Sequence, residues 1–419
     1  MTTPWKRHHY RIKAETADLD DAPDSAILRS KIEPWLAALL QSEHLTLLVG
    51  SGLTNALAHA AGTSPADMNP PPLTGPYADK ITTHAKKSAN KLCRGAPNIE
   101  DTINTMNDLI AGLTILDDKE PDALRSTRDS LLNNFLNIIL RTEHTITTST
   151  NSQVRELLGS FLLTFASRTA TRERLHVATT NYDRLIEYGC DEHGIHVIDR
   201  FTGTITPVFR SSRLDLDLHY NPPGIRGEPR YLEGVIKLNK LHGSIDWRHQ
   251  DGRVRRVPLA YGATNTNDPP GSALIIYPNT VKDVETSHYP YADLFRDFAT
   301  AICRPNSALV TYGYGFGDTH INHAIQDMLT IPSTHLLAIT YDDCNGRLPD
   351  FLARAGHEEQ TSLLVGPHFG DLATLTEYYL PKPAIDPIRV RETALLDRRA
   401  PHTKTTPPGD TDPDDSESA

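Results

Sequence analysis

The feature that most constrains the fold is the alternation of short apolar segments with segments of helical periodicity. In the last third of the chain three such units follow one another, and each apolar segment leads through polar or glycine residues into a helical pattern. The apolar segments are residues 307–312, 335–340 and 361–365. Strands that are joined through helices run parallel and are covered on both faces. The pattern therefore predicts an α/β fold with a doubly wound, mostly parallel sheet.

A glycine turn follows the first buried strand that the sequence predicts. Residues 45–49 are apolar, Gly50-Ser51-Gly52 comes next, and Thr54 lies in an Ala- and Leu-rich segment that predicts a helix to residue 61. A strand, a glycine turn and a helix in this order bring backbone N–H groups up to a phosphate. The same residues are also compatible with a tight turn that binds nothing. A P-loop is excluded, because the chain has no Gly-Lys-Ser or Gly-Lys-Thr.

The next predicted strand ends in the most informative stretch of the chain. Residues 175–179 predict the strand, Thr180-Asn181-Tyr182-Asp183 follow it, and residues 184–193 predict a helix. Ligands of open α/β sheets gather at the carboxyl ends of strands, so the amide and the carboxylate are candidates for ligand contact. Alternatively, Asp183 only caps the helix, since Asp is a preferred N-cap residue.

Two further polar clusters follow predicted strands. Residues 231–241 predict a strand that ends beside His242-Gly243, and the strand at 307–312 leads into a glycine-rich turn over residues 313–318. Alone, each of these motifs is weak evidence for a site. Their common position at strand ends predicts that they meet at one edge of the sheet.

The rest of the chain divides into segments around this α/β unit. Residues 1–30 are polar and predict a flexible N-terminal arm, and residues 381–419 predict a disordered, acidic, Pro- and Thr-rich tail. Residues 31–380 form the predicted domain, with a helical insertion subdomain at about 63–170. Three helices are expected in that insertion, at residues 99–116, 124–140 and 154–165.

Composition excludes several functions. The net charge of −11 and a pI near 5.9 argue against direct nucleic-acid binding and against binding to a membrane surface. No apolar run is long enough to cross a bilayer, and the N-terminus lacks the apolar core of a secretory signal, so we expect a cytoplasmic protein. The four cysteines form no Cys-x-x-Cys pair, which disfavours a zinc ribbon and predicts buried free thiols.

The order of the strand-end motifs resembles the sirtuin-like domain. That family shows a glycine turn after the first strand, Thr-x-Asn-x-Asp (here Thr179, Asn181 and Asp183), a His-Gly (His242-Gly243), and a late Gly-Tyr-Ser-Phe-x-Asp. The late motif reads Gly-Tyr-Gly-Phe-Gly-Asp here, with Gly315 in place of the usual Ser. The resemblance covers residues 45–380 approximately. Four motifs in the right order are far more specific than any one of them.

The resemblance implies a Rossmann-like pocket for NAD. Breaking the nicotinamide–ribose bond passes through an oxocarbenium-like transition state, so the protein must orient the nicotinamide, stabilise a sugar cation and place a nucleophile. By resemblance, Asn181 orients the ribose or the attacking water, and His242 is the general base. Asp183 and the backbone beside Tyr182 are expected to hold the carboxamide. The other implied cofactor-binding residues are Thr180, then Gly50, Ser51, Gly52 and Thr54 at the pyrophosphate, and Gly313, Gly315 and Asp318 on the adenosine side.

The chain also departs from the protein-deacylating sirtuins. It has no paired Cys-x-x-Cys zinc module and no Pro-Asp-Phe-Arg loop after Gly52, and its insertion between the first two motifs is helical. Without these features it is similar to the sirtuin-like NADases of bacterial antiphage systems, in which water replaces the acyl group. The implied activity is NAD+ hydrolysis to nicotinamide and ADP-ribose, with NAD as substrate and no metal. Two alternatives stay open: an NAD-dependent protein deacylase, and a non-catalytic subunit that binds NAD or ADP-ribose for assembly.

The resemblance also implies partners. Within those systems the stand-alone form of the domain is paired with a HerA-type hexameric ATPase, and this chain holds little beyond the domain and its insertion. We therefore expect a homo-oligomer controlled by such an ATPase. An NADase without its own sensor needs such control, because it would otherwise deplete the cofactor of its own cell.

Overall fold

The computed structural model describes nine stretches of the chain. They are residues 5–65, 69–91, 96–117, 121–169, 172–212, 216–220, 230–265, 273–275 and 289–382. The predicted tail at 381–419 lies outside the described residues from 383 onward.

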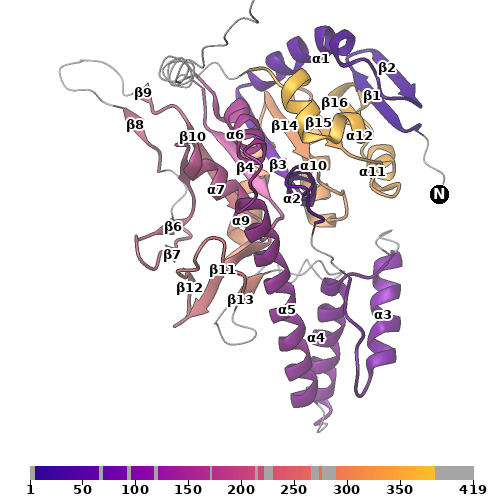
Figure 1. Ribbon diagram of the computed structural model, residues 1–419, viewed down its shortest axis with the longest axis vertical. Coiled ribbons are helices and arrows are strands. Elements are labelled where there is room, and N and C mark those ends of the chain that lie inside the picture. The colour runs from indigo at the N-terminus through magenta and orange to yellow at the C-terminus, as the bar shows by residue number, and fades with distance from the viewer. Residues whose placement is uncertain are drawn as a thin grey trace, which may run out of the picture. The chain divides into compact units, whose positions relative to one another are not determined.

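A nine-stranded sheet forms the centre of the described fold (Figure 1). Its seven central strands run parallel, and two antiparallel strands extend one edge. The order across the sheet is β2 (Glu15–Leu19), β1 (His8–Ile12), β16 (Thr361–Val365), β15 (His335–Thr340), β14 (Ser307–Tyr312), β3 (His44–Val49), β4 (Leu175–Thr179), β10 (Val235–Lys240) and β5 (His196–Ile198). The predicted mostly parallel sheet is confirmed.

The central strands form because their apolar runs can be buried on both faces of the sheet. All six residues of β14 are buried, and so are five of the six residues of β3. Leu47 of β3 pairs with Val310 of β14, and neither side chain is exposed. Burying an aliphatic side chain of this kind stabilises the fold by about 1.5–3 kcal/mol relative to exposure.

Helices cover both faces of this sheet, as a doubly wound fold requires. One face packs against helices from the start, middle and end of the chain: α1 (Ser25–Leu40), α2 (Ser51–Ala60), α6 (Gln153–Ala166), α7 (Leu185–Glu192), α12 (Pro367–Gly370), α13 (Leu372–Thr374) and the π-helical turn η2 (Leu375–Tyr379). The other face packs against α9 (Tyr291–Ile302), α10 (Thr319–Leu329) and α11 (Arg347–Ala355). The short 3-10 helix η1 (Glu358–Gln360) leads into β16. Within the described residues, no helix is both long and apolar enough to cross a membrane.

The order in which strands are added to the sheet reverses between the parallel neighbours β3 and β14. From β3 the sheet grows through β4 toward β5, whereas from its neighbour β14 it grows through β15 toward β16. Such a switch point opens a crevice at the carboxyl ends of the two strands, which is where ligands bind in open α/β sheets. The glycine turn after β3 and the glycine-rich turn after β14 lie at this point.

A second, antiparallel sheet includes β11 (Gly243–Gln250), which begins directly after His242. Its order is β13 (Ala273–Ile275), β11, β12 (Arg253–Arg256), β7 (Val208–Phe209) and β6 (Phe201–Thr202). The hairpin between β11 and β12 turns at Asp251 and Gly252, which both have positive φ, as a two-residue hairpin turn favours. A separate pair of short strands is formed by β8 (His219–Tyr220) and β9 (Arg230–Tyr231).

The helical insertion has its own hydrophobic core, but the insertion includes fewer helices than expected. Helices α3 (Ala78–Lys91), α4 (Ile99–Ile115) and α5 (Pro121–Thr147) share this core. By contrast α6, which the sequence assigned to an insertion at about 63–170, packs on the main sheet through Leu158 and Phe161. The expectation that residues 154–165 belong to the insertion is wrong, because an apolar stripe alone does not show which core it joins.

The N-terminal residues do not form the expected flexible arm. Strand β1 pairs with β16, and β2 pairs with β1, so residues 8–19 extend the central sheet. Tyr10 and Ile12 are each only 6% exposed and join the main core. The prediction failed because β2 is largely exposed and polar, and β1 mixes histidines with its apolar residues, so the segment lacks the apolar run that marked the inner strands.

Candidate functional site

A cavity of about 310 Å³ lies at the carboxyl ends of the strands at the switch point. The loops after β3, β4, β10 and β14 line it, and helices α4 and α5 of the insertion complete its wall. The structure brings together ten of the twelve predicted site residues here: Gly50, Ser51, Thr54, Thr180, Asn181, Tyr182, Asp183, His242, Gly315 and Asp318. The other two, Gly52 and Gly313, line a neighbouring cavity.

Asn181 joins the glycine turn to the loop after β4. Its side-chain nitrogen donates to the carbonyl of Gly50 at 3.0 Å and to the hydroxyl of Thr54 at 3.2 Å. The residue is 8% exposed, and within the described part of the chain its Oδ1 accepts no hydrogen bond. The amide is therefore held by its nitrogen while its oxygen remains available to a ligand in the cavity.

Asp183 has two roles in the structure. Its Oδ1 accepts a hydrogen bond from the amide of Leu185, the first residue of α7, at 3.3 Å, and its Oδ2 accepts from the Thr54 hydroxyl at 2.6 Å. The N-cap residue of α7 is nevertheless Arg184, and no side chain among the described residues caps this helix, so Asp183 holds the turn before α7 and is not its N-cap as the alternative interpretation expected. Its Oδ2 is part of a network with Thr54 and Asn181, on the wall of the cavity.

His242 lies against Asp318, which the sequence analysis did not foresee. The ring Nε2 is 2.9 Å from Asp318 Oδ2, and both side chains are 5% exposed. The second oxygen of Asp318 caps α10 by accepting from the amides of His320 at 3.1 Å and Ile321 at 3.4 Å. Asp318 was expected on the adenosine side, but it lies in the same cavity as Asn181, as the partner of the histidine.

The glycines of the two turns allow the turns to touch. A Cβ on Gly52 would come within 2.4 Å of Gly313 Cα, and a Cβ on Gly50 would come equally close to the Gly313 carbonyl oxygen. The amide of Gly50 donates to the Tyr312 carbonyl, and the amide of Gly52 donates to the Gly313 carbonyl. These two amides, expected at a pyrophosphate, are used to join the loops. Ser51, the first residue of α2, is the turn residue that lines both cavities.

The neighbouring cavity has a volume of about 730 Å³ and meets the first cavity over Ser51, Asn55 and Gly315. Arg347 lines it and donates from Nε to the Gly315 carbonyl at 2.7 Å. A Cβ on Gly315 would lie 3.3 Å from the Arg347 guanidinium, so glycine, where serine is usual, leaves room for this arginine. The two cavities thus lie side by side at the switch point and share three lining residues.

Several lining residues could not be found from the motifs, because they come from the insertion. Glu100 on α4 accepts from the Tyr182 hydroxyl at 2.9 Å. Phe135 on α5 packs edge-on against the Tyr182 ring, with 5.5 Å between the two ring centroids. Asn98 begins α4 with a capping box, a recognisable helix start, but no local signal shows that this helix end reaches the site.

Both cavities are lined by carboxylates, and only the second also has an arginine among its described lining residues: Asp342 and Asp371 lie there with Arg347. The described residues that line the first cavity include three carboxylates, Glu100, Asp183 and Asp318, and no lysine or arginine.

Burial raises the pKa of the Tyr314 hydroxyl well above its ordinary value. Tyr314 is therefore a donor at neutral pH, and its hydroxyl lies 3.3 Å from the Asp318 carbonyl and 3.0 Å from Asn322 Oδ1.

The described cysteines are free thiols, and two of the three are buried. Cys190 and Cys344 are buried free thiols, as predicted, and burial raises the pKa of Cys344 to about 12, whereas Cys303 is partly exposed. Cys93 lies outside the described residues. Among the residues that the structure describes, no group of three or more His, Cys, Asp or Glu side chains could hold a metal ion.

The fold and the cavity define the class of the protein: a Rossmann-like α/β protein whose candidate ligand site lies at the topological switch point. Residues 175–359 match the family model described as the SIR2-like domain. This match supports a sirtuin-like domain and includes Asn181, Asp183, His242 and the turn after β14, although not the glycine turn after β3. SIR2-like domains use NAD, and the family commonly consists of NAD-dependent enzymes. No curated protein matches the chain.

Proposed function

We propose that the chain is an NAD+ hydrolase that cleaves the nicotinamide–ribose bond and releases nicotinamide and ADP-ribose. The observation that carries this proposal is the cavity in which Asn181 and the His242–Asp318 pair converge, next to a second cavity across the glycine turns. An extended dinucleotide needs two connected compartments of this kind. The family match supports NAD as the substrate.

The charge distribution supports the direction in which the dinucleotide would lie. The oxidised nicotinamide is a cation, and it fits the cavity with three carboxylates and no lysine or arginine among its described lining residues. The diphosphate would lie over Ser51 at the N-terminus of α2, where the helix dipole favours an anion. The adenosine would then occupy the larger cavity beside Arg347.

The residues of the first cavity suit the chemistry of bond cleavage. When the nicotinamide leaves, positive charge develops on the ribose, and nearby carboxylates stabilise such a charge in a partly desolvated site. Asn181 would orient the ribose or the attacking water through its Oδ1. His242 would accept a proton from a ribose hydroxyl or from water, and Asp318 would hold the ring and stabilise the imidazolium that forms.

The biological role that we propose is antiphage defence by NAD depletion. The support is the order of motifs, the helical insertion and the lack of paired Cys-x-x-Cys motifs, which resemble the stand-alone antiphage NADases. By the same resemblance we propose a cytoplasmic homo-oligomer under the control of a HerA-type hexameric ATPase. Control by a partner would explain how a cell tolerates the enzyme.

The test is to incubate the purified protein with NAD+ and to follow nicotinamide and ADP-ribose, with and without an acyl-lysine peptide. A hydrolase releases both products at the same rate whether or not the peptide is present. A rate that depends on the peptide, with acyl transfer to ADP-ribose, would instead identify a deacylase. No turnover either alone or with a HerA-type ATPase would refute both enzymatic proposals.

A further inference from the structure

An ion pair links the helical insertion to the loop of the candidate site. Glu143 on α5 is 0% exposed, and Arg184, which directly follows Asp183, is 8% exposed. Arg184 donates from Nη2 to Glu143 Oε2 at 2.7 Å, from Nε to Oε1 at 3.3 Å, and from its backbone amide to the same Oε1. The carboxylate therefore holds both the side chain and the main chain of the residue next to Asp183.

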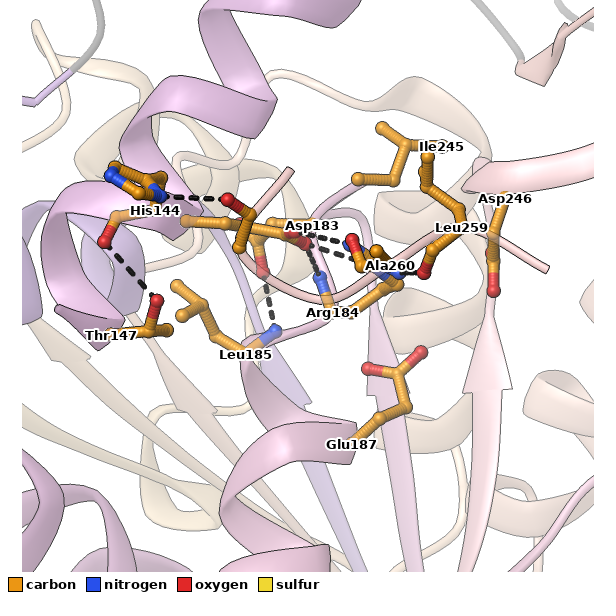
Figure 2. Close-up of polar contacts among 12 residues, drawn as sticks. His144, Thr147, Asp183, Arg184, Leu185, Glu187, Ile245, Asp246, Leu259 and Ala260 are labelled. Carbon is orange, nitrogen blue, oxygen red and sulfur yellow. Dashed lines mark hydrogen bonds and ion pairs between the residues drawn. The ribbon is translucent and has the colours of Figure 1, made fainter. Parts of the chain in front are cut away.

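The same guanidinium reaches a third segment of the chain (Figure 2). Its Nη1 donates to the carbonyl of Leu259 at 2.6 Å, and its Nη2 lies 3.4 Å from the carbonyl of Ala260. The adjacent residue of α5, His144, lies with Nδ1 2.7 Å from the Gly262 carbonyl. Helix α5, the loop after β4 and residues 259–262 thus form one hydrogen-bonded unit.

A buried ion pair such as Glu143–Arg184 adds little to the stability of the fold, but it fixes the position of the residues that it joins. Glu143 is fully buried, so its carboxylate loses hydration in the fold, and this burial raises the pKa of Glu143 against the opposing effect of Arg184. Buried ion pairs of this type are often no more stable than an apolar replacement, but they restrict geometry. Here the geometry that is restricted belongs to the peptide unit between Asp183 and Arg184.

A second contact from the insertion holds the other side of the same loop. Glu100 on α4 accepts from the Tyr182 hydroxyl, and Phe135 on α5 packs against the Tyr182 ring. Tyr182 and Arg184 flank Asp183, and each is held by a carboxylate of the insertion. The loop therefore takes its position from α4 and α5 as well as from the sheet.

We propose that Glu143 is a positioning residue of the site: through Arg184 it sets the geometry of residues 181–183, and it makes the helical insertion the element that controls whether the site is competent. This proposal rests on the proposed NAD hydrolysis for its functional consequence. A displacement of α5, such as a partner bound to the insertion could cause, would disturb the nicotinamide end of the site. It would leave the cavity beyond the glycine turns unchanged, because Glu143 has no contact there.

The first test is the variant Glu143→Gln, which keeps the shape of the side chain and removes its charge. We expect kcat for NAD+ to fall by roughly ten-fold or more, because small misplacements of positioning groups have effects of this size. The dissociation constant of ADP-ribose, which lacks the nicotinamide, should change by less than about two-fold. Asp297→Asn is the matched control, since Asp297 makes a comparable two-contact pair with Arg200 at 2.6 and 2.7 Å away from both cavities.

The second test does not depend on catalysis. Amide hydrogen exchange of residues 180–186 should be faster in Glu143→Gln than in wild type by roughly ten-fold, whereas Asp297→Asn should leave these amides unchanged. If Glu143→Gln does not fold, the double variant Glu143→Gln/Arg184→Gln removes both charges and avoids an unpaired buried ion. In that protein we expect recovered thermal stability with the same loss of kcat and the same fast exchange.

The outcomes separate this proposal from the proposed function. Wild type that neither hydrolyses nor binds NAD+ would refute the function, and the exchange experiment would still decide the positioning role. Unchanged exchange at residues 180–186 in a folded Glu143→Gln protein would overturn the proposal. So would activity that recovers together with stability in the double variant, because the ion pair would then have a structural role only.

Discussion

At the scale of single residues, the site combines local and long-range functions in the same side chains. Asp183 accepts from the amide of Leu185 with one oxygen and from the hydroxyl of Thr54 with the other. Asn181 lines the cavity and uses its side-chain nitrogen to hold the glycine turn. A local role of Asp183 in the turn before α7 is therefore compatible with the expected role in binding, and the contact with Thr54 connects the two.

Thr54 should be needed for this connection. The variant Thr54→Val keeps the shape and removes the hydroxyl that donates to Asp183 and accepts from Asn181. We expect a loss of about 1 kcal/mol in the free energy of unfolding and a fall in NAD+ turnover of roughly ten-fold or more. Thr164→Val is the control, because the buried Thr164 hydroxyl donates to the Ser160 carbonyl far from both cavities. If both variants lose stability alike and both keep full turnover, the Thr54 network has no role in the site.

The glycines should differ sharply in their tolerance of substitution. A Cβ at Gly52 would lie 2.4 Å from the main chain of Gly313, so Gly52→Ala should lower the free energy of unfolding by about 2 kcal/mol or more. At Gly315 the nearest atom belongs to the flexible Arg347 side chain, so Gly315→Ser should fold with nearly unchanged stability. Gly112→Ala in α4 meets no atom within 4 Å and should stabilise the protein by up to about 1 kcal/mol. Thermal unfolding of the three variants checks this order, and a stable Gly52→Ala would show that the two turns are not packed as described.

At the scale of elements, strands could be predicted from the sequence where both of their faces are buried. Strands β3, β4, β14, β15 and β16 could be predicted because parallel inner strands need nearly continuous apolar runs. Strands β1 and β2 could not, because an edge hairpin needs fewer buried residues and mixes polar and apolar positions. The second sheet was not predicted as a sheet, because several of its strands have only two to four residues.

The residues of the candidate site likewise divide into those that the sequence could predict and those that it could not. Residues at strand ends could be found, because topology places all carboxyl ends of parallel strands at one edge. Glu100, Phe135 and Glu143 could not, because they lie on helices of the insertion, and the packing of those helices against the loop after β4 leaves no local sequence signal. The pairing of His242 with Asp318 was missed for a similar reason, since the motifs show order along the chain and not which side chains meet.

A partly buried histidine on the inner strand β15 should make stability depend on pH. Burial, with a smaller contribution from Arg11, lowers the pKa of His335 on β15 to about 4 from an ordinary 6.5. Between these values the unfolded chain binds more protons than the folded chain, so stability falls as the pH falls. For this residue alone the loss from about pH 7.5 to pH 5 is about 2 kcal/mol. Denaturant titrations of wild type and His335→Gln should show a smaller decrease in the variant, whereas the exposed His196→Gln should follow wild type. An equal decrease in all three proteins would contradict this assignment.

At the scale of the whole molecule, two structural units meet at one loop. The sheet supplies the strand-end residues, and the insertion supplies the remaining wall of the cavity and the ion pair behind it. By the positioning role proposed for Glu143, a movement of the insertion would alter the site without any change in the sheet. This agrees with the proposed control by a partner in a homo-oligomer, for which the insertion offers the connection to the loop.

The central claim is that the cavity at the switch point hydrolyses NAD+. The most direct measurement follows NAD+ by proton NMR in the presence of wild type and of Asn181→Ala, each alone and with a HerA-type ATPase. We expect wild type to release nicotinamide and ADP-ribose in equal amounts under at least one of these conditions, and a folded Asn181→Ala to release neither. Release by Asn181→Ala at the rate of wild type would place the chemistry elsewhere, and the absence of release under every condition would contradict the claim.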